Sequence, residues 1–393
     1  MDLPHSVHMV GWAHSQFGKF DAVDVEALLA RVVADALADA QLEAAQIDAL
    51  VVGTFNGGFV QQDFPSSLAI NAQPALRFKP AVRVENACAT GSAAIYQGMQ
   101  AIRAGAADLV LVVGYERMNG LSTREVREVL LKCAYVREET SDTGFAGVFG
   151  GVAGQYFERW GDAGEALAMI AAKNHRNGVG NPYAHMRRDL GFDFCNTVGD
   201  KNPVVAGPLR RTDCSPVSDG AAAIVLCSGR RLAKSGFRRA VGFRAAQQVN
   251  DYLPVSRRDV LMLEGAREAW SRAFSEAGCS LADLSLVETH DCFTIAELLE
   301  MEAMGLAKPG QAPAAVREGL TERDGLLPMN LSGGLKARGH PIGATGVSQH
   351  VMAAMQLVNE AGDMQLAGAS LAGVFNMGGV AVANYASILE RTA

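Results

Sequence analysis

The sequence has few cysteines and no closely spaced pair of them. Seven cysteines occur in 393 residues, at irregular intervals, and no Cys-x-x-Cys segment is present. A disulfide framework or a zinc ribbon within this chain is therefore not expected. The pattern is typical of a reducing, cytoplasmic compartment, in which a special cysteine would act as a nucleophile.

A concentrated run of basic residues is also missing. The formal net charge is −7, and basic residues come mostly as isolated pairs such as Arg187-Arg188 and Arg210-Arg211. Binding to nucleic acid requires a basic face, so no nucleic-acid partner is expected. The pairs are typical of solvated surface, although one of them could contact the phosphates of a nucleotide-bearing ligand.

Long hydrophobic runs are scarce. Residues 1–19 contain no apolar core of the kind found in signal peptides. Residues 366–389 carry no charge, but four glycines, two asparagines and two serines interrupt them. A membrane-spanning helix of about 20 residues is more uniformly apolar. We therefore predict two buried strands that break at Asn376–Gly379, and no membrane association.

What is present is the composition of a globular enzyme. Hydrophobic residues make up 49% of the chain, charged residues 20%, and 42 glycines are spread along it. A chain of this length is too long for one simple core, so two or three packed units are expected.

One pattern occurs twice, since Leu284 repeats the position of Ile47 after 237 residues. Residues 24–40 show the apolar spacing of a helix, and a buried strand follows over 47–53. A helix over 264–277 and a strand over 284–287 repeat this order, and Ala-Thr-Gly opens a helix at 89–91 and again at 344–346. We predict two β/α halves, residues 1–240 and 241–393, built as layered sheets with helices between and outside them.

The periodicity weakens between about residues 119 and 211, where charged residues, glycine, asparagine and proline interrupt it. We expect an inserted loop domain there, after which the first half resumes with a strand over 221–227. The aromatic residues of this insertion could fill a core or line an acyl pocket; they include Tyr135, Phe145, Phe149 and Phe157.

Cys88 is the first candidate for chemistry. It stands between an apolar strand and a helix start rich in small residues, Ala87-Cys88-Ala89-Thr90-Gly91. Free backbone N–H groups and the helix dipole favour an anion at such a place, which lowers the pKa of a thiol. The alternative is that Cys88 is a small buried hydrophobic residue.

Two histidine segments are the next candidates. His340 stands in Gly339-His340-Pro341 just before a helix, where its ring can take a proton from a thiol or donate to an oxyanion. His290-Asp291-Cys292 follows the strand of the second half, and strand ends are where site residues collect in layered α/β folds. A metal site at His290, Cys292 and Asp291 is the competing interpretation, but a second ligand pair at metal-like spacing is missing.

The other cysteines and histidines have no comparable setting. We assign five cysteines to packing, namely Cys133, Cys195, Cys214, Cys227 and Cys279. His350 lies in an apolar helix and is expected in a core or an interface. His175 and His185 lie in the insertion, where contact with a ligand is an open alternative.

These segments together resemble the thiolase superfamily, and the similarity runs nearly end to end. The Cys88 segment and Gly339-His340-Pro341-x-Gly343 are similar to family blocks, and His290-Asp291-Cys292-Phe293 resembles the sterol-carrier-protein type of thiolase. The resemblance implies a five-layered αβαβα fold of two βαβαβαββ halves with an inserted loop domain. It also implies a homodimer or a dimer of dimers.

One departure from the family pattern concerns the second catalytic thiol. Most thiolases carry it in a Cys-x-Gly block near the C-terminus, where this chain has Asn376-Met377-Gly378. In the sterol-carrier-like branch the cysteine of the His-Asp-Cys-Phe block can take that role. The resemblance therefore implies that Cys292 is the second thiol.

The resemblance implies a thiolytic or condensing acyl-CoA C-acyltransferase, with coenzyme A as substrate and no covalently bound cofactor. Cys88 would carry the acyl group, with help from His340, and His290 and His340 would stabilise an enolate. Cys292 would be the acid or base. The backbone N–H groups of Cys88 and Gly378 would hold the other oxyanion, since glycine allows a close main-chain approach.

Several alternatives stay open. One is a thiolase-like aldolase or acyltransferase acting on a steroid, aromatic or polyketide-like substrate. Ketoacyl carrier-protein synthases share the fold but lack the cysteine of His290-Asp291-Cys292. A non-catalytic acyl-CoA-binding subunit is disfavoured because all four reactive side chains are present. Bacterial relatives of this branch can also work with a small zinc-ribbon/OB-fold partner that helps to bind CoA.

Overall fold

The computed structural model describes residues 6–20 and 24–393 of the chain. Nine strands form the main sheet, in the order β3-β2-β4-β7-β1-β8-β11-β10-β9. The first five in the chain are β1 (Val7–His14), β2 (Ala49–Gly53), β3 (Ala81–Val84), β4 (Leu109–Glu116) and β7 (Gly220–Ser228). The other four are β8 (Val241–Asn250), β9 (Leu286–Glu288), β10 (Leu371–Gly378) and β11 (Ala383–Arg391).

The two groups of strands repeat one pairing scheme. In the first group β2 runs parallel to both β3 and β4, and β4 is antiparallel to β7. In the second group β9 runs parallel to β10, and β10 is antiparallel to β11. The counterpart of β3 is reduced to a single parallel bridge between Val287 and Met329. The repeat predicted from the sequence is thus confirmed, with a weaker third strand in the second copy.

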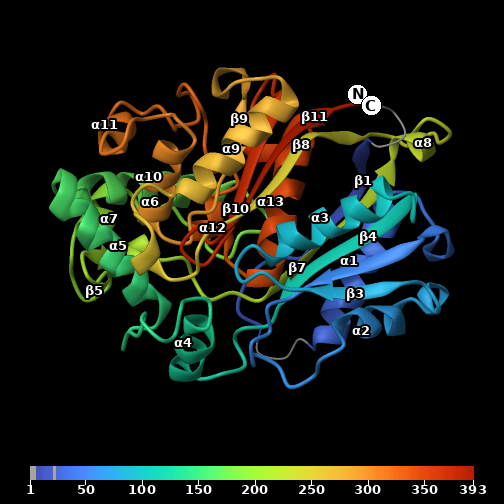
Figure 1. Cartoon of the computed structure of the whole chain (residues 1–393), viewed down its shortest axis with the longest axis horizontal. Helices are drawn as coiled ribbons and strands as arrows, with labels where there is room; N and C mark the ends of the chain where they lie inside the picture. Colours follow the sequence, from blue (N-terminus) through green and yellow to red (C-terminus); the bar gives the residue numbers. More distant parts are fainter. Residues whose placement is uncertain (1–5, 21–23) are drawn as a thin grey trace.

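Helices lie on both sides of each group of strands and between the groups. The long helices are α1 (Val25–Asp39), α3 (Thr90–Arg103), α9 (Glu264–Ala277), α10 (Thr294–Ala303) and α13 (Ile342–Leu357). Apolar residues of α1 pack on β1, β4 and β7, and those of α9 pack on β8 and β11. In Figure 1, α3 and α13 lie between the cyan strands and the red strands. This gives the predicted five layers, and the central pair β1–β8 joins the two groups of strands through only two residue pairs.

The helices α3 and α13 cross at the two Ala-Thr-Gly segments. A Cβ atom on Gly91 would lie 2.7 Å from the backbone nitrogens of Gly346 and Val347. Glycine at this crossing therefore allows the backbones to touch. The contact brings the N-terminus of α3, where Cys88 lies, next to the N-terminus of α13, where His340 lies.

The segment between β4 and β7 is mainly helical. It contains α4 (Thr123–Leu131), α5 (Phe145–Trp160), α6 (Gly164–Val179), α7 (Phe192–Asn196) and the short pair β5 (Val204–Ala206) and β6 (Leu209–Arg210). These elements lie beside α10 and the short helices α11 (Ala312–Arg317) and α12 (Gly334–Arg338), at the left of Figure 1. The remaining helices are α2 (Pro65–Ala72) and α8 (Gly229–Leu232). The domain limits given above stay predictions.

The uncharged segment near the C-terminus forms β10 and β11, as predicted. Strand β10 ends at Gly378, within the predicted break at Asn376–Gly379, and Asn376, Met377 and Gly378 still pair with β11. No described helix has both the length and the apolar character needed to cross a membrane.

Candidate active site

Cys88 lies in a tight loop between β3 and α3. Ala87 has a φ of 49°, the left-handed region that favours glycine. Thr90 fixes the loop, because its hydroxyl donates to the Ala87 carbonyl (2.6 Å) and accepts from the Asn86 N–H (2.8 Å). The Cys88 side chain is buried at the start of α3, where free N–H groups favour an anion.

His340 presents one ring nitrogen to the site as a proton acceptor. Its Nδ1 lies 2.7 Å from the Thr345 hydroxyl, which donates to the Pro341 carbonyl. The hydroxyl hydrogen is thus engaged, so the Thr345 oxygen accepts from Nδ1–H. The lone pair of the neutral ring is then on Nε2.

His290 has the opposite tautomer. The amide nitrogen of Asn376 donates to the Cys88 carbonyl (3.1 Å) and lies 2.8 Å from His290 Nδ1. Since a carbonyl can only accept, this contact fixes the amide orientation, and Nδ1 of His290 accepts the second N–H. The ring hydrogen is then on Nε2. Burial lowers the pKa of His290 to about 4, so the ring is a neutral donor near pH 7.

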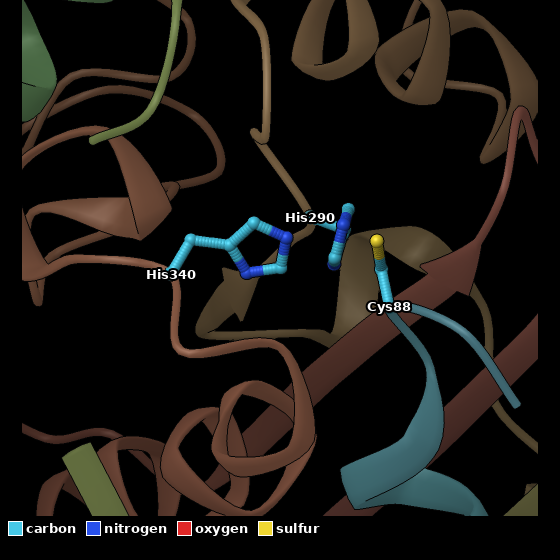
Figure 2. Close-up of side chains that lie close together, drawn as sticks. All are labelled: Cys88, His290 and His340. Atoms are coloured by element: carbon cyan, nitrogen blue, oxygen red, sulfur yellow. The ribbon is translucent and has the colours of Figure 1, made fainter. Parts of the chain in front are cut away.

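The three side chains converge on one point. The sulfur of Cys88 and a nitrogen of each ring all lie within 4.8 Å of one another. Figure 2 shows the two imidazoles and the sulfur from three separate chain segments, and the ring centroids are 5.1 Å apart at an interplanar angle of 85°. One thiol therefore meets one imidazole acceptor and one imidazole donor.

The predicted alternative of a metal site at His290, Cys292 and Asp291 does not match this arrangement. Within residues 6–20 and 24–393, the group of potential ligands is Cys88, His290 and His340. Asp291 instead accepts hydrogen bonds from the backbone N–H groups of Leu335 (2.6 Å) and Lys336 (3.1 Å). Its carboxylate thus fixes α12, which leads into the His340 turn.

Cys133 is a member of the site that the sequence did not reveal. Its thiol lies within hydrogen-bonding reach of Cys88 and, as a donor, lowers the pKa of Cys88 more than any other group. Burial opposes this effect, and His290 and His340 add to it, so the pKa of Cys88 falls well below its usual range. The pKa of Cys133 moves the other way, well above its usual range. Cys133 packs in the core, as predicted, and in addition contacts Cys88.

A cavity of about 190 Å³ opens onto the candidate site residues. Cys88, Cys292 and His340 line it, together with apolar side chains such as Phe145 and Phe293. Burial, and then the charge on Cys88, raise the pKa of Cys292 well above its usual range, so Cys292 keeps its proton. Cys214 packs against the core, as predicted, and also lines this cavity.

Glu116 links the His340 turn to the first half. At the end of β4 it accepts hydrogen bonds from the backbone N–H groups of Phe55 (2.9 Å), Asn56 (3.0 Å) and Gly343 (3.0 Å). Burial raises the pKa of Glu116 to about 7. Because Gly343 follows His340 by three residues, this carboxylate helps to fix the position of the imidazole.

Comparisons with protein families agree with the fold described above. Residues 7–191 match the family model of the thiolase N-terminal domain, and residues 246–391 match that of the thiolase C-terminal domain-like region. The chain belongs to the thiolase family. The resemblance noted in the sequence is thus confirmed, and with it the prediction of a thiolase-type acyltransferase.

Individual relatives cover most of this thiolase chain. An acetyl-CoA acetyltransferase of Methanothermobacter thermautotrophicus is 34% identical over 95% of this chain and 96% of its own. Sterol carrier protein 2 of Oryctolagus cuniculus is 32% identical over 95% of this chain and 70% of its own. The solved Ltp2-ChsH2(DUF35) aldolase has a TM-score of 0.82 at 20% identity, covering 99% of both chains, and shows similarity of fold.

The sequence-predicted residues of this thiolase lie together. Cys88, His290, Cys292 and His340 meet around one site. A Cβ atom on Gly378 would lie 2.5 Å from the Asn86 carbonyl, so the main chain of β10 touches the Cys88 loop. Its part in an oxyanion hole stays a prediction.

The remaining candidates lie elsewhere. His350 is buried and bonded to the Gly346 carbonyl (2.7 Å), as expected for a core residue. His185 bonds the Ser218 hydroxyl (2.9 Å), which also accepts from the His340 N–H. His175 lies in a different cavity. The insertion residue Phe149 stacks on Phe293, which lines the active-site cavity.

Proposed function

We propose that this thiolase cleaves a 3-ketoacyl-CoA with coenzyme A, or runs the reverse Claisen condensation, through an acyl group on Cys88. The observation that carries the proposal is a low-pKa Cys88 beside His340 and a proton-bearing Cys292 in one cavity. The 34% identical relative named acetyl-CoA acetyltransferase supports this class of reaction. No covalently bound cofactor enters the proposal.

In the first half-reaction Cys88 gives its proton to Nε2 of His340 and attacks the 3-keto carbon. The tetrahedral oxyanion collapses, the C2–C3 bond breaks, and the acyl group stays on the Cys88 sulfur. The electron pair of that bond becomes the enolate of the departing thioester. Nε2–H of His290 donates to the enolate oxygen, and Cys292 gives its proton to C2. The first product is an acetyl-CoA-type thioester.

In the second half-reaction coenzyme A takes over the acyl group. Its thiol gives a proton to the Cys292 thiolate, which restores Cys292, and the CoA thiolate attacks the acyl carbon. Collapse of this intermediate breaks the bond to Cys88 and releases the shortened acyl-CoA. The Cys88 thiolate is left paired with protonated His340, and return of this proton to Cys88 restores the starting state. We place the carbonyl oxygen of the acyl group at the N–H groups of Cys88 and Gly378.

The test of this function is a panel of 3-ketoacyl-CoAs of different chain length, assayed with and without coenzyme A. CoA-dependent formation of two thioesters is the expected result. A second candidate, a thiolase-like aldolase, is favoured by Asn376 in place of the usual thiol and by the structural similarity to an aldolase. CoA-independent release of an aldehyde or ketone would replace the first proposal by the second.

Exchanging Asn376 for aspartate tests the tautomer of His290. A carboxylate at this position can only accept, so the ring hydrogen of His290 would move to Nδ1 and the donor at Nε2 would be lost. We expect kcat to fall by about 10²- to 10³-fold, as for the loss of one oxyanion donor. Nitrogen-15 NMR of the side chain reports the tautomer directly. Asn384→Asp, another buried asparagine bonded to Ala381, controls for burying a carboxylate.

If NMR shows that the ring hydrogen of His290 has moved to Nδ1 in Asn376→Asp and kcat is nevertheless unchanged, then His290 does not donate to the oxyanion.

Exchanging Cys133 tests the tuning of the nucleophile. In Cys133→Ala the donor to the Cys88 thiolate is missing, so the pKa of Cys88 rises. The thiolate then forms only at higher pH, and iodoacetamide alkylation of Cys88 at pH 7 should slow by about tenfold or more. Cys133→Ser keeps a hydroxyl donor and should stay close to the parent profile. Identical pH profiles for the alanine variant and the parent would contradict this role.

We further propose a homodimer, or a dimer of dimers, as the working assembly. Strand β3 is an edge strand, and Val82 on it and Phe78 before it are 46% and 88% exposed. An open edge with exposed apolar residues favours pairing with a second copy. A small zinc-ribbon/OB-fold subunit is a further candidate partner, and native mass spectrometry of the purified protein and its complexes distinguishes these assemblies. A cytoplasmic location stays a prediction.

A further inference from the structure

A second, basic cavity lies next to the active-site cavity. It has a volume of about 530 Å³, and the segment Cys214–Val217 lines both cavities. The side chains around it include Lys201, Arg211, Lys336 and His175, and its lining contains no aspartate or glutamate. Three fixed positive charges around an empty volume without a carboxylate favour an anionic ligand.

Lys336 lies at the buried end of this cavity. It belongs to α12, four residues before His340, and is only 3% exposed. The neighbouring acids are engaged elsewhere, since Asp213 pairs with Arg210 (2.9 Å) and Asp291 accepts from backbone N–H groups. Burial lowers the pKa of Lys336, which shows how poorly its charge is solvated. A bound anion would compensate this buried charge.

His175 forms a second buried polar group at the cavity. Its ring is fully buried, and among residues 6–20 and 24–393 neither nitrogen has a well-aligned hydrogen bond, although the backbone of Arg188 comes close. Burial and then the nearby charge of Lys336 lower its pKa to about 3, so the ring is neutral and can donate. Lys201 and Arg211 are exposed, where they can attract an anion toward Lys336.

We propose that this cavity binds a carboxylate at the far end of the acyl group, so that the substrates are 3-ketoacyl-CoAs derived from dicarboxylic acids. The inference rests on the proposed function and narrows its substrate class. The active-site cavity of about 190 Å³ is small and largely apolar, and we place the far end of a longer acyl chain beyond the segment Cys214–Val217 that both cavities share. One buried ammonium and one buried imidazole match a single carboxylate.

The experiment compares 3-oxoadipyl-CoA with 3-oxohexanoyl-CoA, two chains of equal length that differ in a terminal carboxylate. We expect the parent protein to prefer 3-oxoadipyl-CoA in kcat/KM. Lys336→Met should lower the ratio of the two kcat/KM values by about 10- to 100-fold, as for a lost charge-assisted hydrogen bond. Lys336→Arg should keep most of the preference, and Lys308→Met, an exposed lysine outside the cavity, should keep all of it. An unchanged ratio in Lys336→Met overturns the proposal.

A binding measurement separates this proposal from the proposed function. Calorimetry with Cys88→Ala protein compares adipyl-CoA with hexanoyl-CoA, so no turnover is needed. Tighter binding of adipyl-CoA supports the site even if no thiolysis is found, and equal affinities overturn it.

Two additions make the result unambiguous. Adipyl-dephospho-CoA keeps the carboxylate but lacks the 3′-phosphate of CoA. If Lys336→Met no longer weakens binding of this ligand, the cavity binds the 3′-phosphate, and the carboxylate proposal is overturned. Arg211→Ser, at an exposed position, should weaken adipyl-CoA binding in the same direction and remains informative if Lys336→Met does not fold.

Discussion

Cys88→Ala is expected to lower kcat/KM for thiolysis by about 10⁴- to 10⁶-fold, because it removes the atom that carries the acyl group. The remaining imidazoles can polarise the substrate but cannot accept an acyl group in a stable thioester. The measurement is CoA-dependent cleavage of a 3-ketoacyl-CoA, together with the intact mass of the protein after mixing with acyl-CoA. The added mass of the acyl group should be present in the parent and absent in the variant.

A matched control for Cys88→Ala is Cys279→Ala. This variant removes a half-buried thiol that does not line the active-site cavity. This variant should keep parent activity and form the acyl-enzyme. Persistent acylation of Cys88→Ala, or equal losses in both variants, would place the nucleophile elsewhere.

Cys292→Ala should separate the two chemical steps. Acylation of Cys88 by an acyl-CoA does not require a proton at carbon, so the acyl-enzyme should still form. The rate of proton transfer at C2 should fall by about 10²- to 10⁴-fold, as for the loss of a general acid or base. Exchange of the C2 hydrogens of acetyl-CoA with deuterated water measures this step without a complete turnover, and mass spectrometry measures acylation.

The outcome for Cys292→Ala also separates the two candidate functions. Normal acylation with lost exchange supports a thiolase in which Cys292 replaces the missing thiol at position 376. Unchanged exchange would show that another group moves the proton and would favour the aldolase alternative. Cys227→Ala, in the core on β7, controls for removal of a buried thiol.

The repeated fold could be predicted because its signal is local. The helices α1 and α9 and the strands that follow them have apolar spacing that is visible within short windows. The link between the two sheets could not be predicted, since it consists of two residue pairs between β1 and β8, about 230 residues apart. The weak strand around Met329 likewise depends on a partner at Val287 rather than on its own sequence.

The candidate site residues also divide into those with a local signal and those without one. Cys88, His290 and His340 stand in unusual local segments at element ends, which draws attention to them in a single sequence. Asn376 and Cys133 have ordinary surroundings, and their importance comes from contacts with Cys88 across long stretches of chain. The sequence shows that position 376 lacks a thiol, but only the fold places the Asn376 amide against His290.

The crossing of α3 and α13 at Gly91 and Gly346 makes the reactivity of Cys88 depend on completed folding. The nucleophile comes from the first copy of the repeat, whereas both imidazoles and the Asn376 amide come from the second. Before the copies dock, Cys88 has neither imidazole beside it, so two of the groups that lower the pKa of its thiol are missing. An incompletely folded chain is therefore less prone to uncontrolled acylation or oxidation.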